Sequence, residues 1–298
     1  MENLFQRQEL QRQLDQDGCV VVPFLEPDEL AELREFYYSR HPDGIAPQMR
    51  DGIHMTIWCS DRPYKDQIRE GLQQILGAAA RRLYQDFRLV SPVFIVKRKG
   101  ADTTFPIHQD WNVVDETQHR AFNMWIPLHD VDESNGALWI VKGSHKFPNH
   151  VRGPGYLFPR MYHLESHIRP FMEPMAMKAG NALIFYHRVI HGSPPNQTDS
   201  PRVVVAMSVL PEQVPLHIYF QKDAESQLEV YHPHDEFIYE FENVRDQTAF
   251  KPPSGAPLSI EKPFQQFEFT EEWFDRYHAG KPKLGFWERL FGKKAVGV

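Results

Sequence analysis

The stretch Phe105-Pro106-Ile107-His108-Gln109-Asp110-Trp111 decides the fold and the chemistry expected of this chain. It follows a β-rich run, Val93-Phe94-Ile95-Val96, and is itself predicted to be extended. In an extended strand, residues i and i+2 point to the same face, so His108 and Asp110 can aim an imidazole nitrogen and a carboxylate oxygen at one point. These are two of the three ligands of a two-histidine, one-carboxylate facial triad, which holds iron(II) on one face and leaves the other face open.

The composition is that of a globular protein, and it excludes several classes. A chain of 298 residues can bury a large core. The 33 basic and 40 acidic side chains give a net charge of −7, whereas binding a phosphate backbone needs a basic surface, so no nucleic-acid partner is expected. Cys19 and Cys59 are too few for a disulfide scaffold or a Cys-rich zinc site, and they favour a cytoplasmic protein with reduced thiols. The sequence shows no apolar run long enough to span a bilayer and no signal-peptide pattern.

The first 90 residues show helical periodicity in three segments and one short apolar run between the first two. Three helices are predicted, over 3–16, 29–38 and 65–86, with a buried strand at 19–24 after the Asp17-Gly18 turn. Residues 41–63 are rich in Pro, Gly, Met and Trp and are predicted to be irregular.

From residue 91 the pattern changes to short apolar segments between Gly, Pro and Asn turns. This pattern is typical of a β-sandwich or barrel, and no helices alternate with the strands as in a doubly wound parallel sheet. Residues 146–172 interrupt the strands as a long loop, and such loops are often lids or binding loops. The predicted strands are 92–98, 105–111, 121–129, 137–141, 174–178, 182–186 and 202–210.

Two histidines, His187 and His191, compete to be the third ligand. Only His191 is followed by Ser193 at +2 and Arg202 at +11. Arg202 opens the apolar run 203–207, where a cation needs an anionic partner. Because guanidinium binds carboxylate bidentately, a dicarboxylic co-substrate would fit, with the Ser193 hydroxyl as a further donor. His187 is then interpreted as a packed core histidine or a neighbour of the ligands.

At these positions the chain resembles the phytanoyl-CoA dioxygenase family of iron(II)/2-oxoglutarate oxygenases. The resemblance covers roughly residues 15–211 and depends on the order and spacing of its segments. Residues 41–65, 146–172 and 212–298 match no family segment and would shape substrate choice. The matching segments are Asp17-Gly18-Cys19-Val20-Val21-Val22-Pro23 with Pro27-Asp28-Glu29-Leu30, His108-Gln109-Asp110, Trp125 through Asn135-Gly136-Ala137-Leu138, Gly143-Ser144-His145, and His191-Gly192-Ser193 with Asn196 and Arg202.

The resemblance implies a mainly β fold, a double-stranded β-helix of the jelly-roll type with N-terminal helices packed on it. Residues 1–211 would form the dioxygenase domain. Residues 212–298 would elaborate it as a lid, a dimer contact or a docked tail. A terminal helix, Phe286 to Phe291, is predicted to dock on the core, and its aromatic and basic residues leave a membrane surface as the alternative.

The resemblance also implies a reaction. His108, Asp110 and His191 would hold iron(II), 2-oxoglutarate would chelate the metal, and Arg202 with Ser193 would bind its far carboxylate. Reaction with dioxygen would convert 2-oxoglutarate to succinate and drive hydrogen abstraction from a substrate C–H. Related halogenases have a small residue in place of the carboxylate ligand, so Asp110 favours hydroxylation, or a desaturation or cyclisation that begins with the same abstraction.

Several further residues have two readings. Asn123 and Trp125 share one face of a predicted strand, where Asn123 could donate to 2-oxoglutarate and Trp125 could line the same site or pack in the core. Lys97 could reach the pocket or lie in solvent. His41-Pro42-Asp43 repeats the His-x-Asp spacing in a turn, where side chains do not alternate. His145 is assigned to a turn, and His232-Pro233-His234-Asp235 to a loop.

Substrate residues are expected on the two unmatched loops. Met55, Trp58 and Phe158 would give an apolar lining, and Arg160 could meet a carboxylate or phosphate. The substrate expected is a mid-sized, partly apolar small molecule, with an acidic group as an option. The same loops carry further candidates of both kinds, Met49, Arg50, Arg152, Met161, Tyr162 and Arg169.

Two rival functions use the same residues. A non-catalytic β-helix protein could bind a metal or small molecule, and a zinc hydrolase could activate water with the same triad. Neither explains Arg202, which is why an oxygenase is favoured. The expected partner is a small-molecule substrate, and a homodimer is a further option.

Overall fold

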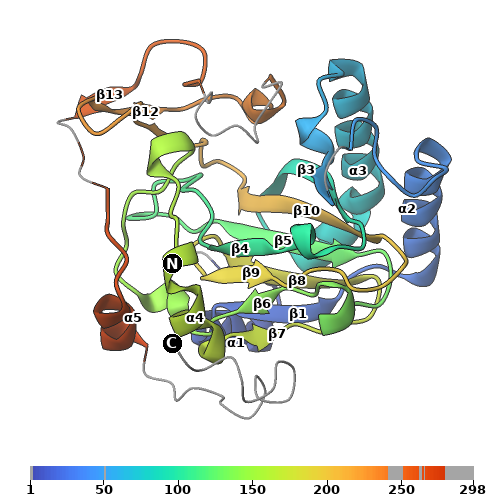
Figure 1. Ribbon diagram of the computed structural model, residues 1–298. Coiled ribbons are helices and arrows are strands. Elements are labelled where there is room, and N and C mark those ends of the chain that lie inside the picture. The colour runs from blue at the N-terminus through green and yellow to red at the C-terminus, as the bar shows by residue number, and fades with distance from the viewer. Residues whose placement is uncertain (1–2, 50–51, 241–250, 262–263, 265, 279–298) are drawn as a thin grey trace.

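Two antiparallel sheets form the centre of the molecule, as the jelly-roll prediction requires (Figure 1). The computed structural model describes residues 3–49, 52–240, 251–261, 264 and 266–278. The larger sheet has the order β1 (Cys19–Pro23), β8 (Asn181–Tyr186), β5 (Phe122–Pro127), β10 (Arg202–Pro211), β3 (Phe87–Lys97), β2 (Ile53–Met55). The smaller sheet has the order β4 (Phe105–His108), β9 (His191–Ser193), β6 (Trp139–Ile140), β7 (Glu173–Pro174).

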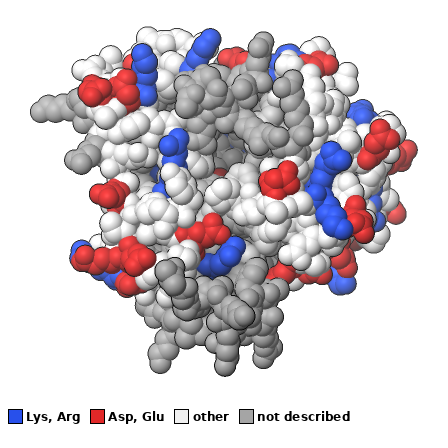
Figure 2. All heavy atoms as spheres, viewed as in Figure 1, with Lys and Arg blue, Asp and Glu red and all other residues white. Residues whose placement is uncertain are grey.

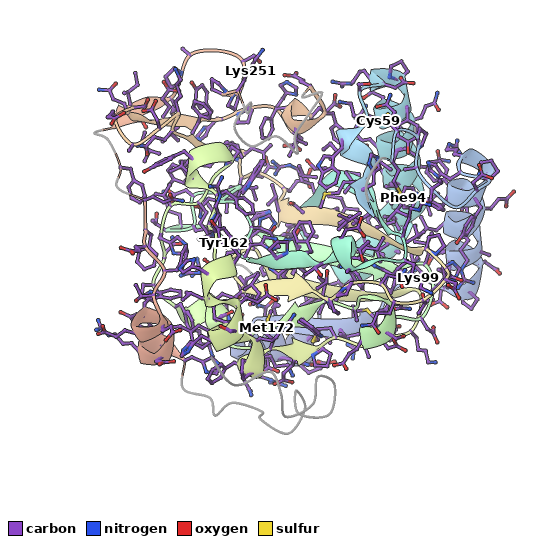
Figure 3. All side chains as sticks on the ribbon, viewed as in Figure 1. Cys59, Phe94, Lys99, Tyr162, Met172 and Lys251 are labelled. Atoms are coloured by element: carbon purple, nitrogen blue, oxygen red, sulfur yellow. The ribbon has the colours of Figure 1, made fainter. Side chains whose placement is uncertain are left out.

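The larger sheet is apolar on both faces because helices cover one of them. Phe94 of β3 is fully buried, and its ring lies 4.8 Å from that of Tyr37 in α2 (Figure 3). Apolar residues three and four apart form the buried side of α3, which confirms the predicted helical spacing. The helices are α1 (Gln8–Asp17), α2 (Pro27–Arg40) and α3 (Arg62–Leu83).

Local sequence explains where these helices begin and end. In α2, Glu26 and Glu29 form a reciprocal capping box ahead of the Pro27 start. In α1, Gly18 ends the helix at φ +81°, a backbone conformation that glycine adopts without a steric penalty, and its N–H donates to Leu14 O at 2.8 Å. The three predicted helices are thus present, with ends that differ by a few residues.

The strands depart from prediction in length and number. The strand predicted at 105–111 ends at His108, and those predicted at 137–141 and 174–178 are two-residue pairings. Residues 41–63 are not wholly irregular, because β2 adds to the edge of the larger sheet and a 3₁₀ turn, Thr56–Trp58, follows it. Short edge segments carry too few residues for an alternation to be visible in sequence. The 146–172 loop contains one short α-helix, α4 (Glu165–Ile168), and three 3₁₀ turns.

The segment after β10 forms structure that the sequence did not reveal. β11 (Ile218–Phe220), β12 (Leu228–Tyr231) and β13 (Ser259–Glu261) make a third antiparallel sheet. α5 (Glu271–Tyr277) packs Trp273 against Phe147 of the long loop, with ring centroids 5.2 Å apart. The helix predicted at 286–291 lies outside the described residues, and the division at residue 211 stays a prediction.

The surface and helices bear on the expected partners. Figure 2 shows Lys and Arg interspersed with Asp and Glu on the visible face, without a basic stripe among the described residues there. Within the described part of the chain, no helix has the length and apolarity needed to cross a membrane. Cys19 and Cys59 are both buried free thiols.

Candidate metal centre

The structure brings His108, Asp110 and His191 together at the edge of the smaller sheet where β4 pairs with β9. Their ligand atoms all lie within 4.8 Å of one another. His108 ends β4 and stands directly opposite His191, the first residue of β9. Gly192 permits this close approach, since a Cβ there would lie 3.0 Å from the carbonyl oxygen of Phe105. Strand pairing therefore places two ligands that are 83 residues apart in sequence.

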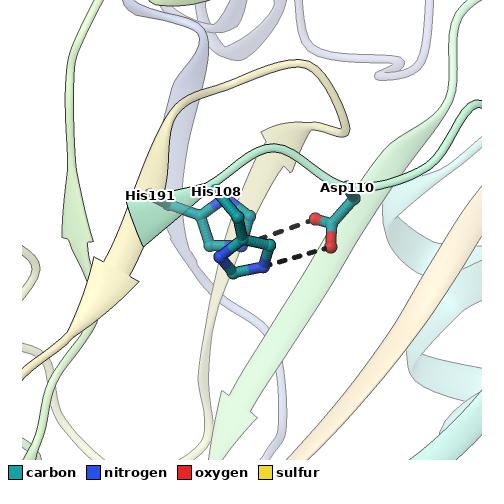
Figure 4. Close-up of side chains that lie close together, drawn as sticks. All are labelled: His108, Asp110 and His191. Atoms are coloured by element: carbon teal, nitrogen blue, oxygen red, sulfur yellow. Dashed lines mark ion pairs between the residues drawn. The ribbon is translucent and has the colours of Figure 1, made fainter. Parts of the chain in front are cut away.

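Both imidazoles are oriented by backbone carbonyls. His108 Nδ1 lies 2.8 Å from Pro106 O, and His191 Nδ1 lies 2.9 Å from Val189 O. A carbonyl only accepts hydrogen bonds, so each Nδ1 carries the proton and each Nε2 keeps its lone pair. The Nε2 atoms lie 3.6 and 3.5 Å from the two carboxylate oxygens of Asp110 (Figure 4). Three donor atoms therefore converge on one point.

The ionisation states suit a divalent metal. Burial lowers the pKa of His191 to about 4, which leaves the ring neutral and able to ligate at neutral pH. Burial alone would raise the pKa of Asp110, but the imidazoles of His191 and His108 outweigh it and hold that pKa below its usual range. Two neutral imidazoles and one carboxylate form the donor set of a facial iron(II) site.

Asp110 lies beyond the end of β4, and neighbouring groups fix it. Its N–H donates to His187 O at 2.9 Å, and its carbonyl accepts from Arg152 Nε at 2.7 Å. The side-chain amide of Asn123 donates to Oδ2. Arg152 is itself buried against Glu116, with 2.5 Å between Nη2 and Oε1. Asn123, predicted to donate to 2-oxoglutarate, thus orients a metal ligand in this structure.

We expect Asn123→Ala to weaken metal binding about 10- to 100-fold, because groups that hydrogen-bond a ligand carboxylate set its orientation. Competition for iron(II) against a chromogenic chelator under anaerobic conditions measures this loss. Asn181→Ala is the matched control, since Asn181 begins β8 and bonds to none of the ligands. Equal affinity in the wild type and Asn123→Ala would show that Asn123 does not position Asp110.

A cavity of about 110 Å³ adjoins the triad on the side of β3 and β10 and contains two buried basic side chains. Arg202 is 4% exposed and Lys97 is 0% exposed, and the two stand opposite each other in the strand pairing. Neither has an acidic partner among the described residues. Burial lowers the pKa of Arg202 to about 9, so its guanidinium is still charged at neutral pH. Burial, with Arg202 beside it, lowers the pKa of Lys97 well below its usual range, so an anion bound here would favour the charged form of Lys97 as well as neutralise Arg202. A buried guanidinium and a buried amine without an acidic partner in the described part of the chain indicate a site for an anion.

The remaining co-substrate candidates lie around Lys97 and Arg202. Lys97 Nζ donates to Ser193 Oγ at 2.5 Å and to Pro194 O at 2.8 Å. The guanidinium of Arg202 lies over the Trp125 ring at 5.3 Å, and Trp125 lines the cavity. Asn196 does not line it; its amide donates to Lys97 O at 3.1 Å and helps close the β9–β10 loop. The sequence left open whether Lys97 reaches the pocket or lies in solvent, and the structure places it, fully buried, in the cavity lining.

A second cavity, of about 260 Å³, also adjoins the triad and contains the predicted apolar lining; we call it the outer cavity. Met55, Trp58 and Phe158 all line it, and the Phe158 ring stacks on His108 at 5.8 Å. Asp110 is the one charged side chain among the described residues that line it. Arg160 is exposed and belongs to the lining of neither cavity.

The other loop candidates that the structure describes do not line this cavity. Arg152 and Arg169 form ion pairs with Glu116 and Glu165. Met161 is buried in a separate cluster, and Tyr162 is largely exposed on the outside (Figure 3). Met49 packs against the main core, and Arg50 lies outside the described residues. The option of an acidic substrate group therefore has no support in the described residues.

Other histidines occupy structural positions. His187 holds Asp110 through its carbonyl, and its Nδ1 lies 3.1 Å from Trp111 O. His145 stacks on Tyr186 at 4.9 Å, in a turn as expected. His234 lies 2.9 Å from Glu240 in the loop expected there. Among the described residues, the triad is the one group with the geometry of a metal site.

Comparisons with known proteins agree with the fold. A family model described as phytanoyl-CoA dioxygenase (PhyH) matches residues 14–204. A relative, "Phytanoyl-CoA dioxygenase domain-containing protein 1" of Danio rerio, is 27% identical over 134 residues, which is 41% of this chain and 46% of the relative. The chain matches half or less of the length of its curated relatives.

Two solved structures share the fold at low identity. The epimerase SnoN in complex with Fe3+, alpha ketoglutarate and nogalamycin RO is 20% identical, with a TM-score of 0.52 and coverage of 87% of this chain and 95% of that one. The carbocyclase SnoK from nogalamycin biosynthesis is 17% identical, with a TM-score of 0.50 and coverage of 70% and 86%.

Proposed function

Because this chain belongs to the phytanoyl-CoA dioxygenase family of iron(II)/2-oxoglutarate oxygenases, we propose that it hydroxylates a C–H bond of a small, partly apolar molecule. The observation that carries the proposal is a converging His-Asp-His triad that borders two cavities, one lined by the buried Lys97 and Arg202 and the other mainly apolar. Those three parts correspond to a metal, an anionic co-substrate and an apolar substrate.

Three side chains would hold the metal, and the rest of the site prepares it. His108 and His191 would bind through Nε2 and Asp110 through its carboxylate, with Asn123 and the carbonyl of His187 keeping Asp110 in place. When bound, iron(II) with 2-oxoglutarate and dioxygen supplies the oxidising power, with succinate and carbon dioxide as co-products.

Lys97 and Arg202 would select the co-substrate. Arg202 can bind a carboxylate through two N–H donors, and Lys97 adds an amine in the same cavity whose charged form a bound anion would favour. Ser193 already accepts from Lys97, so its hydroxyl proton is free to donate to the same anion. Burial strengthens these interactions because little water competes for the charges. These residues would thus hold the far carboxylate of 2-oxoglutarate away from the metal. That contact would orient the keto acid end of 2-oxoglutarate toward the metal.

The apolar cavity would direct the reaction to one C–H bond. Phe158 lies against His108 and Met55 lines both cavities, so a substrate in the outer cavity would be bound beside the triad. Aromatic and aliphatic walls exclude water, which protects reactive steps from side reactions.

Oxygen-dependent formation of succinate from 2-oxoglutarate, strictly requiring iron(II), tests the proposed class. The mass of the organic product then tests the reaction type: hydroxylation adds one oxygen atom, desaturation or cyclisation removes two hydrogens, and epimerisation leaves the mass unchanged. Succinate without added oxygen in the product would retain the oxygenase class and reject hydroxylation.

The rival functions make different demands. A zinc hydrolase would be active with zinc alone, and a binding protein would take up metal without turnover. Neither uses two buried basic side chains beside the metal. The cytoplasmic location and a homodimer both stay predictions, which fractionation and sedimentation analysis would test.

A further inference from the structure

Apart from His108, Asp110, Asn123 and His187 at the triad, the outer cavity has an apolar lining interrupted by two serines, which form a polar strip. Ser91 of β3 and Ser208 of β10 both line it, and neither hydroxyl bonds to any side chain or backbone group that the structure describes. We propose that these two serines bind an oxygen-bearing group of an uncharged, mainly apolar substrate. The inference rests on the proposed function, because it takes the outer cavity as the substrate site.

A β-bulge brings the two serines to the same cavity. Val90 pairs with Ser208, and the register then shifts so that Ser91 and Pro92 together face Met207. An extra residue of this kind bends the strand and redirects its side chains. Both hydroxyls thereby reach the cavity from neighbouring strands.

The backbone at the bulge is unusual for a serine. Ser91 has φ +56°, in the left-handed region that favours glycine. The hydroxyl of Tyr239 donates to the carbonyl of the next residue, Pro92, at 2.8 Å and braces the bulge. Strained residues of this kind concentrate at ligand sites and persist where surrounding structure holds them. The bulge, braced by Tyr239, therefore holds Ser91 in place at the cavity wall.

The rest of the lining defines the substrate class. Asp110 is the single charged group among the described lining residues, and it belongs to the triad. A charged substrate would lose its hydration here without gaining a counter-charge. Trp58, Phe158 and Phe237 supply large apolar surfaces for its carbon skeleton. Because a serine hydroxyl donates and accepts, the strip fits a hydroxyl, carbonyl or ether oxygen.

Two probes of matched shape test the strip: 4-ethylphenol and 4-ethyltoluene, which differ by a hydroxyl in place of a methyl. Calorimetric titration uses the protein loaded with nickel(II), which is redox-inert here, and 2-oxoglutarate. The wild type is expected to bind the phenol about tenfold more tightly. Ser208→Ala and Ser91→Gly should each reduce that preference, and the double variant should abolish it.

The variants are chosen so that folding is unaffected. Glycine readily adopts a positive φ, so Ser91→Gly should melt at the wild-type temperature or above it. Asp86→Gly is the matched control, because Asp86 also has φ +56° but is exposed and outside the cavity. It should leave the phenol preference unchanged.

The outcomes separate this inference from the proposed function. An equal preference in the wild type and the double variant, or binding of neither probe by fully loaded protein, would overturn the polar strip. Failure to take up nickel and 2-oxoglutarate, with the phenol preference intact, would overturn the proposed function and leave the strip standing.

Discussion

Asp110→Ala is expected to abolish 2-oxoglutarate turnover, with a fall of at least about 1,000-fold, or ~4 kcal/mol in the activation barrier. The change removes the sole anionic donor of the triad and leaves two neutral imidazoles to hold a divalent metal. It also leaves the Asn123 amide without its acceptor. Succinate formation with excess iron(II) measures the loss, and metal content after desalting shows whether binding has failed.

The chain contains a matched control for this change. Asp43 occupies the same His-x-Asp pattern in His41-Pro42-Asp43, but it is exposed, and His41 bonds instead to Tyr37 O at 2.8 Å and lies 2.8 Å from the Tyr64 hydroxyl. Asp43→Ala should retain wild-type turnover. Full activity in Asp110→Ala would refute the ligand assignment.

Arg202→Met is expected to weaken 2-oxoglutarate binding about 100- to 1,000-fold, because breaking a buried charge pair costs about 3–5 kcal/mol. The charge pair lost in this variant would be the one between Arg202 and the far carboxylate of the co-substrate. 2-Oxobutyrate presents the same keto acid to the metal without that carboxylate, so its weaker binding should hardly change in the variant. Titration of both keto acids into the iron-loaded protein measures the difference.

Stability distinguishes this role from a structural one. Without co-substrate, Arg202 is a buried cation with no acidic partner among the described residues, so Arg202→Met should melt at the wild-type temperature or above it. Arg160→Met is the matched control, since Arg160 is exposed and outside both cavities. A lowered melting temperature with equal losses for both keto acids would indicate that Arg202 supports the fold alone.

The approach of His108 to His191 could be expected from the sequence, because it follows from strand pairing and motif spacing; their role as metal ligands stays a prediction. The downstream Ser193 and Arg202 distinguished His191 from His187 as the candidate ligand. The structure pairs His191 with His108. Asp110 reached the same point for a different reason than expected. The strand ends at His108, and a backbone bond to His187 O holds the carboxylate where alternation alone was expected to place it.

Lys97 shows why side-chain direction could not be predicted. Val90 lines the outer cavity, so unbroken alternation along β3 would point residues 92, 94 and 96 inward and Lys97 outward. The bulge at Ser91-Pro92 inserts one residue and reverses the alternation, so that Val93, Ile95 and Lys97 line the cavities. A bulge depends on tertiary contacts, which the sequence does not display.

The segment beyond residue 211 was missed for a related reason. Its strands β11 and β13 have three residues each, too short for a periodic pattern, and they pair mainly with β12. Trp273 and Phe274 are buried against the 146–172 loop, which itself has little regular structure to predict. Contacts between two irregular segments leave no local signature.

Anaerobic absorption spectroscopy of the iron(II)-loaded protein on addition of 2-oxoglutarate tests the metal and the co-substrate site together. We expect a weak visible metal-to-ligand charge-transfer band that saturates at low 2-oxoglutarate in the wild type and in Arg160→Met, and only at far higher concentration in Arg202→Met. A band with the same concentration dependence in Arg202→Met would contradict the assigned co-substrate site. The absence of any band in protein that retains its iron would contradict the oxygenase assignment itself.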